Sequence, residues 1–411
     1  MKALVLAGGF PQIALTKELQ RRGYYVLMAD YNENPVAKAY ADKYYRVSTL
    51  DIDAVRNVVK TEKADLIITV CTDQALLTSA QISEEFGLPS YIDNKTALNV
   101  TNKLHMKKVF VDNGIPTAKH LVMEEFDSSK IKDLKFPLII KPVDCNSSKG
   151  VIKAYDTNTA KQAFENAAKL SRTNSAVIEE YKEGLELSID VYVENGNAKV
   201  LCVSCSEKIK SDEQFIIFRE KYPSEISQSA HKQIQDTAQK IADAFGLVDS
   251  PMLIQAIWDG EEISVIEFSA RTGGGVKYLL IKQVCGVDII KETVDLTLGE
   301  KPHIELKEPV NKYILNEYIY CHKGRFDRLE NFDKLKDEKV ISDYYTFTWQ
   351  GAEFDSINSS GDRVAGFTVQ DDDIEQLQRK HNAAVRELKV LDENGRDIMR
   401  HDLLPNANFR A

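Results

Sequence analysis

Several features are scarce or missing in this sequence of 411 residues. No apolar run approaches the length of a bilayer crossing, and the opening apolar run, 3–7, is too short for the core of a signal peptide. The six cysteines are scattered, and the one close pair, Cys202 and Cys205, has no second pair or histidines beside it. We therefore expect a cytoplasmic protein with reduced thiols, and neither a disulfide framework nor a zinc site.

An excess of positive charge is also missing. The chain has 53 lysines and arginines against 63 aspartates and glutamates, which gives a net charge of −10 at pH 7. Such a chain has no general attraction to phosphate backbones or anionic lipids, so we expect neither nucleic acid nor a membrane as a partner. Any anionic ligand must be bound by a local group of cations.

The remaining composition is that of a folded protein with more than one core. Hydrophobic residues make up 43% and charged residues 28%, and a chain of this length is expected to form two or three domains. We expect an α/β unit at 1–93, a mixed α+β region at 94–300 with a small subdomain at about 117–182, and a C-terminal α+β unit at 301–411.

The first part alternates strands and helices, which predicts a doubly wound parallel sheet. The expected elements are strands at 3–6, 25–29 and 66–70 and a helix at 12–22. Gly8 and Gly9 lie between the first strand and this helix, and Asp30 ends the next strand, as in a dinucleotide-binding loop. The third glycine of that loop is missing, so a nicotinamide-dependent dehydrogenase remains a secondary alternative.

The second part contains a lysine within an apolar strand. Lys141 lies in the run 136–142, which reads as a buried strand, so its ammonium group needs an anion beside it. A second strand follows the polar tip of this hairpin. Backbone N–H groups and hydroxyls at such a tip can bind phosphate oxygens. The tip residues considered are Ser147, Ser148, Lys149 and Gly150.

A second hairpin, at 251–268, combines carboxylate and amide side chains. Its turn places Gln255 nearly opposite Glu267, and alternation along the second strand puts Glu267, Ser269 and Arg271 on one face. Oxygen ligands in this arrangement suit Mg²⁺, which shares its coordination shell with water and phosphates. The planar guanidinium group of Arg271 suits a phosphoryl group.

Four stretches in this order, Lys103, 136–151, 177–186 and 265–275, resemble the ATP-grasp superfamily. The resemblance covers about residues 1–300 and is closest to the carboxylate-amine ligase branch, which includes carbamoyl phosphate synthase, biotin carboxylase and purine-pathway members. It implies an ATP-grasp fold with an N-terminal doubly wound domain, a small lid subdomain and a C-terminal α+β unit.

The resemblance also assigns roles to individual residues. It implies that Lys103 and Lys141 bind nucleotide phosphates and that Glu186 binds the ribose hydroxyls. The segment implied to lie along the adenine consists of Glu179, Glu180, Tyr181 and Lys182. The implied metal ligands are Gln255, Glu267 and Ser269, although the first of these positions is often acidic in the family and the third is usually asparagine. The implied catalytic residue is Arg271, and the implied substrate contacts are Gly273, Gly274, Gly275, Lys208 and Arg219.

The activity that the resemblance implies is ligation of a carboxylate to an amine through an acyl phosphate, with release of ADP and phosphate. ATP and Mg²⁺ are the implied cofactors, with Mn²⁺ as a substitute, and the partners are a small acid and a small amine. The C-terminal unit would serve packing or the surface of a homodimer. The alternatives are an ATP-grasp carboxylase or kinase, the dehydrogenase named above, and a nucleotide-binding regulator with a decayed site, which Ser269 favours.

Overall fold

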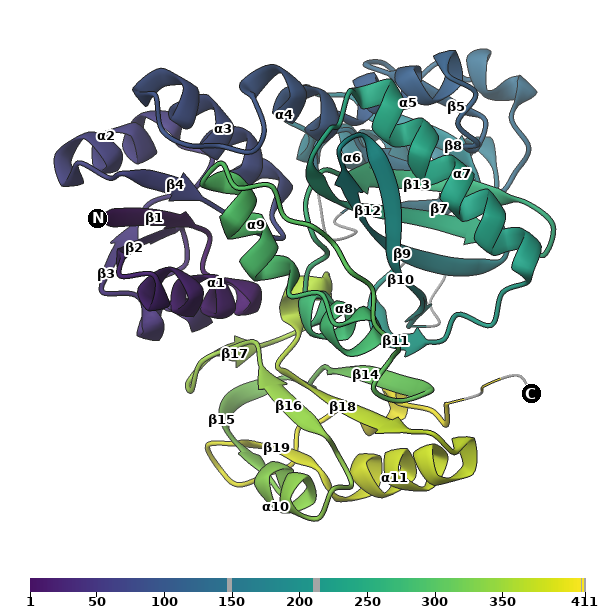
Figure 1. Cartoon of the computed structure of the whole chain (residues 1–411). Coiled ribbons are helices and arrows are strands. Elements are labelled where there is room, and N and C mark those ends of the chain that lie inside the picture. Colours follow the sequence, from purple (N-terminus) through teal and green to yellow (C-terminus); the bar gives the residue numbers. More distant parts are fainter. Residues whose placement is uncertain (146–149, 210–214, 408, 410–411) are drawn as a thin grey trace.

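The computed structural model describes residues 1–145, 150–209, 215–407 and 409. The N-terminal unit, at the left of Figure 1, is a sheet in the order β3-β2-β1-β4, and all of its pairings are parallel. The doubly wound parallel sheet expected from the sequence is therefore confirmed. Its elements are β1 (Lys2–Leu6), α1 (Phe10–Arg21), β2 (Tyr25–Asp30), η1 (Val36–Tyr40), β3 (Lys43–Arg46), α2 (Ile52–Glu62), β4 (Leu66–Ile68) and α3 (Asp73–Phe86).

The turn after β1 is closed by the protein itself. A Cβ atom on Gly8 would lie 2.6 Å from Cβ of Pro35, so the proline covers the backbone that a pyrophosphate would have to approach. Asp30 accepts hydrogen bonds from the backbone N–H groups of Gly8 and Asn32, each at 2.7 Å, and is used inside its own loop. The structure gives no support to the dehydrogenase alternative.

Two short helices, α4 (Asn94–Thr101) and α5 (Lys103–Asp112), follow the N-terminal unit. The break between them is at Asn102, whose side-chain oxygen accepts a hydrogen bond from the His105 N–H at 3.1 Å and caps α5. This cap makes Lys103 the first residue of α5. Lys107 then lies one helical turn later on the same face.

A small four-stranded sheet in the order β5-β8-β6-β7 forms the next unit. β6 and β7 pair antiparallel, as predicted for the hairpin around Lys141, but its tip residues Ser147, Ser148 and Lys149 lie outside the described residues. The unit has its own core, which includes Leu138, Ile140 and Phe164. Its elements are β5 (His120–Met123), η2 (Lys130–Asp133), β6 (Leu138–Pro142), β7 (Ile152–Ala154), α6 (Thr157–Leu170) and β8 (Ala176–Glu180).

The largest sheet is antiparallel and has eight strands in the order β13-β12-β9-β10-β11-β14-β18-β16. α7 packs on one of its faces through residues such as Ile234 and Ile241, and α8 packs on the other through Leu280 and Ile281. The elements before residue 300 are β9 (Leu185–Glu194), β10 (Asn197–Lys208), β11 (Ile217–Tyr222), α7 (Gln228–Phe245), β12 (Ser250–Trp258), β13 (Ile263–Ser269), α8 (Lys277–Cys285) and α9 (Ile289–Thr297).

The C-terminal residues extend this sheet, because β14 pairs with β11, and add a small sheet in the order β17-β15-β19 (Figure 1). The expected mixed α/β and α+β fold class is confirmed. None of the helices in the described part of the chain has the length and apolar character that a membrane crossing needs. The C-terminal elements are β14 (Tyr313–Ile319), β15 (Gly324–Glu330), α10 (Phe332–Asp337), β16 (Asp343–Thr346), β17 (Glu353–Phe354), η3 (Ser360–Asp362), β18 (Ala365–Asp371), α11 (Ile374–Glu387), β19 (Lys389–Asp392) and η4 (His401–Leu403).

Arg219, which the sequence placed near the substrate, lies instead inside the contact between β11 and the C-terminal elements. Its side chain is fully buried, and Nε donates to Glu317 Oε1 at 2.5 Å. Nη1 donates to Glu207 Oε2 at 3.0 Å, and Nη2 donates to the carbonyl oxygen of Pro405 at 2.6 Å and lies 3.2 Å from His381 Nε2. The guanidinium group is occupied in holding β11, β14 and α11 together, so the expected substrate contact is not found.

Replacement of Arg219 by leucine should therefore weaken folding rather than substrate binding. Loss of the guanidinium group leaves the buried carboxylate of Glu317 without its main partner, and we expect a loss of about 3–5 kcal/mol in the free energy of unfolding. Arg325→Leu, which removes an exposed ion pair with Glu393, is the control and should cost less than about 1 kcal/mol. Urea denaturation measures both, and equal midpoints for the two variants would contradict the structural role.

Candidate active site

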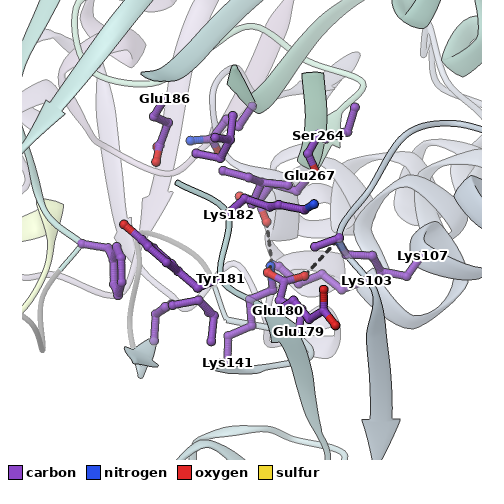
Figure 2. A pocket seen from close by; sticks show the side chains of 18 of the residues that line it. Lys103, Lys107, Lys141, Glu179, Glu180, Tyr181, Lys182, Glu186, Ser264 and Glu267 are labelled. Carbon is purple, nitrogen blue, oxygen red and sulfur yellow. Dashed lines mark hydrogen bonds and ion pairs between the residues drawn. The ribbon is translucent and has the colours of Figure 1, made fainter. Parts of the chain in front are cut away.

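A pocket lies between the small sheet and the large sheet. Figure 2 shows lysine and glutamate side chains from α5, β6, β8 and the large sheet gathered around it. Ten of the twenty residues selected from the sequence lie here although they come from distant parts of the chain. Those that line the pocket are Lys103, Lys141, Glu179, Glu180, Tyr181, Lys182, Glu186, Lys208, Gln255 and Glu267.

One wall of the pocket is built around the buried carboxylate of Glu179. Oε1 lies 2.5 Å from Nζ of Lys141, and Oε2 lies 2.9 Å from Nζ of Lys107, which also donates to Thr117 Oγ1 at 2.7 Å. Burial alone would raise the pKa of Glu179, but the charges of Lys107 and Lys141 outweigh it and lower the pKa to about 2. Glu179 thus fixes two ammonium groups at the pocket wall.

The opposite wall carries the expected pairing of an amide with a carboxylate. Gln255 on β12 lies directly opposite Glu267 on β13, and the register shifts immediately after this pair. The shift leaves Ile266 without a partner, so this residue lines the pocket instead of pointing to the apolar face as strict alternation would require. Glu267 is accessible, with about a third of its side chain exposed, and its Oε2 lies 3.3 Å from Nζ of Lys103.

The charge state of Glu267 follows from these neighbours. Burial raises its pKa, and the positive charges of Lys103 and Lys141 oppose burial and bring the pKa below its usual value. Lys103 also donates to the carbonyl oxygen of Cys145 at 2.8 Å, at the base of the small hairpin. An accessible, ionised carboxylate beside an amide oxygen is therefore held at this wall.

The segment after β8 forms the third side of the pocket. The N–H groups of Glu180 and Tyr181 donate to the carbonyl oxygens of Lys119 and Pro137, each at 3.0 Å, which anchors the extended backbone. The N–H of Lys182 has no acceptor among the residues that the structure describes. Glu186 forms an ion pair with Lys208, so Lys208 lies at this pocket.

Arg271 and Ser269 follow Glu267 along the chain but do not line the pocket. Arg271 forms a two-point ion pair with Asp73, at the start of α3: Nε donates to Oδ1 at 2.8 Å and Nη2 donates to Oδ2 at 2.6 Å. The Ser269 hydroxyl also donates to this carboxylate. Burial would raise the pKa of Asp73, and the charge of Arg271 lowers it overall.

The three glycines after Arg271 lie in the loop that leads into α8. A Cβ atom on Gly273 would lie 2.7 Å from Cγ of Lys277, whereas one on Gly274 would meet open space. Gly275 has a φ of +63°, and a Cβ atom there would lie 2.5 Å from the Tyr318 hydroxyl. The backbone of this loop therefore packs against both the large sheet and the C-terminal unit.

Two residues with clear structural roles at this site were not selected from the sequence. Lys107 is four residues after Lys103, and this helical spacing could have indicated a second cation on the same face. Asp73 carries no such signal, because its contact with Arg271 joins positions 198 residues apart. Gly150, which was selected, has a φ of +75° and packs against Leu170 at the end of the small hairpin.

The side chains of this pocket fit a nucleoside triphosphate with its magnesium ion. Lysine ammonium groups at one wall can meet phosphate oxygens, and an accessible carboxylate faces an amide oxygen at the other. In the described part of the chain, no group of three or more His, Cys, Asp or Glu side chains could hold a metal by itself. Mg²⁺ in proteins commonly takes one or two carboxylates and completes its coordination shell with water and substrate phosphates.

Comparisons with known proteins match one domain of this chain to a described family. Residues 134–278 match the family described as ATP-grasp domain. Formate-dependent phosphoribosylglycinamide formyltransferase of Saccharolobus solfataricus is 26% identical over 253 residues, which are 60% of this chain and 63% of that protein. The chain thus spans less than two thirds of the length of this curated relative.

Solved structures resemble the chain over nearly its whole length. The L-amino acid ligase from Bacillus licheniformis has a TM-score of 0.78 at 20% identity and covers 96% of this chain and 99% of its own. The biotin carboxylase domain of 2-oxoglutarate carboxylase from Hydrogenobacter thermophilus has a TM-score of 0.79 at 17% identity, with 98% and 92% covered. The chain contains an ATP-grasp domain and has the ATP-grasp fold, which confirms the resemblance seen in its sequence.

The buried triad of Lys107, Glu179 and Lys141 can be tested through stability. Glu179→Gln leaves two buried ammonium groups without their carboxylate, and we expect a loss of about 3–5 kcal/mol in the free energy of unfolding at pH 7. The matched control, Glu180→Gln, changes a half-buried neighbour that accepts a hydrogen bond from the Lys135 N–H, and we expect a loss of about 1 kcal/mol or less.

The pH dependence of this effect has a defined sign. Because folding lowers the pKa of Glu179 from 4.5 to about 2, its stabilisation is complete above the unfolded value and is lost as the pH falls from about 4.5 to about 2. Chemical denaturation at pH 7 and pH 3 should show a smaller loss of stability on acidification in Glu179→Gln than in the wild type. Equal losses would show that the carboxylate is not held ionised by the two lysines.

Proposed function

We propose that this chain is a magnesium-dependent ATP-grasp ligase that activates a carboxylate as an acyl phosphate and joins it to an amine. The observation that carries the proposal is the single pocket in which Lys103 and Lys141 face the paired side chains of Gln255 and Glu267. The match to the ATP-grasp domain supports ATP as the nucleotide, and the accessible carboxylate of Glu267 supports magnesium as the metal. The name of the formyltransferase relative specifies formate, which is a small carboxylate.

The nucleotide contacts follow from the walls of the pocket. Lys103 and Lys141 bind phosphate oxygens. Glu186, whose carboxylate is paired with Lys208, also accepts hydrogen bonds from the ribose hydroxyls. The Lys182 N–H donates to the adenine edge, in the segment that begins at Glu179 and continues through Glu180 and Tyr181. Gly150, at the end of the small hairpin, contributes its backbone N–H to the phosphates.

Magnesium would be held by Glu267 and Gln255. Ser269, the third ligand expected from the sequence, lies outside the pocket lining and donates to Asp73, so it would contact the ion only through water. The ion supplies positive charge to the phosphates during phosphoryl transfer, and Mn²⁺ has the same preference for oxygen ligands. Glu267 is the residue on which this site depends, because it is the ionised member of the set.

The reaction proceeds in two balanced steps. A carboxylate oxygen of the acid forms a bond to the γ-phosphorus as the bond to the ADP oxygen breaks, which gives an acyl phosphate and ADP. The amine nitrogen then bonds to the carbonyl carbon, phosphate leaves, and the amine loses a proton to solvent or a nearby base. Arg271 neutralises charge on the transferred group, and N–H groups of Gly273, Gly274 and Gly275 meet the acid.

A carboxylase or kinase of the same fold is the second candidate, and the similarity to a biotin carboxylase domain is the observation that favours it. Both candidates use the same nucleotide pocket and differ in what receives the phosphoryl or acyl group. We further propose a cytoplasmic location and small-molecule acid and amine partners. A homodimer is proposed because the structure of that biotin carboxylase domain is described as a dimer.

A screen of ADP release across acids and amines tests the proposal. We expect MgATP to be consumed at a substantial rate only when a matching acid and amine are both present, with one ADP, one phosphate and one amide formed per cycle. ADP release that requires bicarbonate and biotin, or a phosphorylated product without an amide, would favour the second candidate. No turnover with any acid would count against a ligase and favour the binding-only regulator.

The metal assignment is tested separately with Glu267→Gln. This change removes the ionised ligand but keeps its shape, so ATP turnover should fall by at least about 100-fold, as for loss of one strong electrostatic contact in the transition state. The control is Glu262→Gln, an exposed position before the same strand, which should retain wild-type turnover. Thermal unfolding verifies that both variants are folded, and full activity in Glu267→Gln would remove the assignment.

A further inference from the structure

The corner between β4 and α3 brings the N-terminal unit to the candidate active site. Cys71, the third residue after the end of β4, has a φ of +63°, a backbone conformation that residues other than glycine rarely adopt. Such local strain is retained where the surrounding structure fixes the turn, often near functional sites. The turn places Asp73 and Gln74 at the first two positions of α3.

Asp73 holds Arg271 by two parallel hydrogen bonds. Both side chains are largely buried, with exposed fractions of 15% for Asp73 and 13% for Arg271. A two-point contact with a carboxylate fixes the plane of a guanidinium group, which a single contact leaves free to rotate. The direction in which Arg271 presents its remaining N–H groups is therefore set by a residue of the N-terminal unit.

The guanidinium group of Arg271 still has N–H groups that can bind a ligand. It has five N–H groups, of which Nε and one on Nη2 donate to Asp73 and one on Nη1 donates to the carbonyl oxygen of Thr272 at 2.9 Å. One N–H on each of the two terminal nitrogens has no acceptor in the part of the chain that the structure describes. An anion can use these two groups without displacing Asp73.

The neighbouring residue ties the same corner to the small hairpin. Gln74 Nε2 donates to the carbonyl oxygen of Asp144 at 3.0 Å, and Lys103 donates to the carbonyl oxygen of the next residue, Cys145. Adjacent residues of α3 thus contact both the strand end that carries Arg271 and the base of the hairpin at the phosphate side of the pocket. The N-terminal unit is in a position to fix these two parts relative to each other.

We infer that Asp73 is a positioning residue that orients Arg271 toward the transferred phosphoryl group, so that the N-terminal unit sets the geometry of the reaction. The inference rests on the proposed function for the identity of the anion, a phosphoryl or acyl phosphate group. The opposite interpretation, in which Asp73 competes with that anion for Arg271, predicts the reverse result in the test below.

The first measurement is steady-state kinetics of Asp73→Asn with the best acid and amine. Asparagine preserves the shape but loses the charge, so we expect kcat to fall about 10- to 100-fold, as for other residues that orient a reactive group, with KM for MgATP unchanged within about twofold. Asp73→Glu should recover part of kcat because it restores the charge. The matched control is Asp295→Asn, which breaks the ion pair of α9 with Arg22 of the N-terminal unit and lies outside the pocket lining.

The comparison separates positioning from simple docking of the N-terminal unit. Equal changes in kcat and thermal midpoint for Asp73→Asn and Asp295→Asn would show that Asp73 only helps to attach the unit, and would overturn the inference. A rise in kcat for Asp73→Asn would support competition and overturn it as well.

A second measurement does not depend on turnover. With ¹⁵N-labelled arginine, the Nε–H signal of Arg271, identified by its loss in Arg271→Lys, is followed during titration with inorganic phosphate. We expect the wild-type signal to shift and the apparent Kd for phosphate to weaken at least fivefold in Asp73→Asn. An unchanged or tighter Kd overturns the inference. If the wild type releases no ADP with any acid, the proposed function fails, and this titration still decides the role of Asp73.

Discussion

Charge balance among buried and half-buried side chains is the constraint on which the candidate site depends. Four lysines at the pocket lie against glutamates: Lys107 and Lys141 share Glu179, Lys103 lies beside Glu267, and Lys208 pairs with Glu186. Ammonium groups cannot be buried beside one another without anions, because the cost of removing each from water is several kcal/mol. The glutamates therefore allow a cluster of cations to exist before any phosphate arrives.

The same pairs explain how the pocket can exchange partners. Glu179 is buried and holds two lysines, so it remains part of the wall, whereas Glu267 is accessible and pairs with one lysine among the residues that the structure describes. A triphosphate that reaches Lys103 would release Glu267 from its ion pair, and the freed carboxylate would then face the amide of Gln255. In the proposed site, binding of the nucleotide and formation of a magnesium site would be coupled, because Lys103 contacts both the phosphates and Glu267.

The rest of the fold brings these pairs together from separate units. The small sheet supplies Lys141 and Glu179, the large sheet supplies Gln255 and Glu267, and α5 supplies Lys103 and Lys107. The N-terminal unit contributes Asp73, and the C-terminal elements are locked onto the large sheet through the buried contacts of Arg219. The glycines after Arg271 lie between the large sheet and the C-terminal elements. Lys277 and Tyr318 leave no room there for side chains at positions 273 and 275.

The sequence by itself determined the elements and many of the pocket residues. Period-two alternation and hairpin geometry are local properties, so the pairing of Gln255 with Glu267 and the position of Lys141 on a buried strand could be predicted from neighbouring residues. Other features of the site were decided by the tertiary structure alone. Arg219 pairs with Glu317, which is 98 residues away in the sequence, and a register shift turns Ile266 toward the pocket. Asp73 pairs with Arg271, which is 198 residues away. Such contacts depend on how separate units pack, and residues so far apart leave no periodic pattern along the chain.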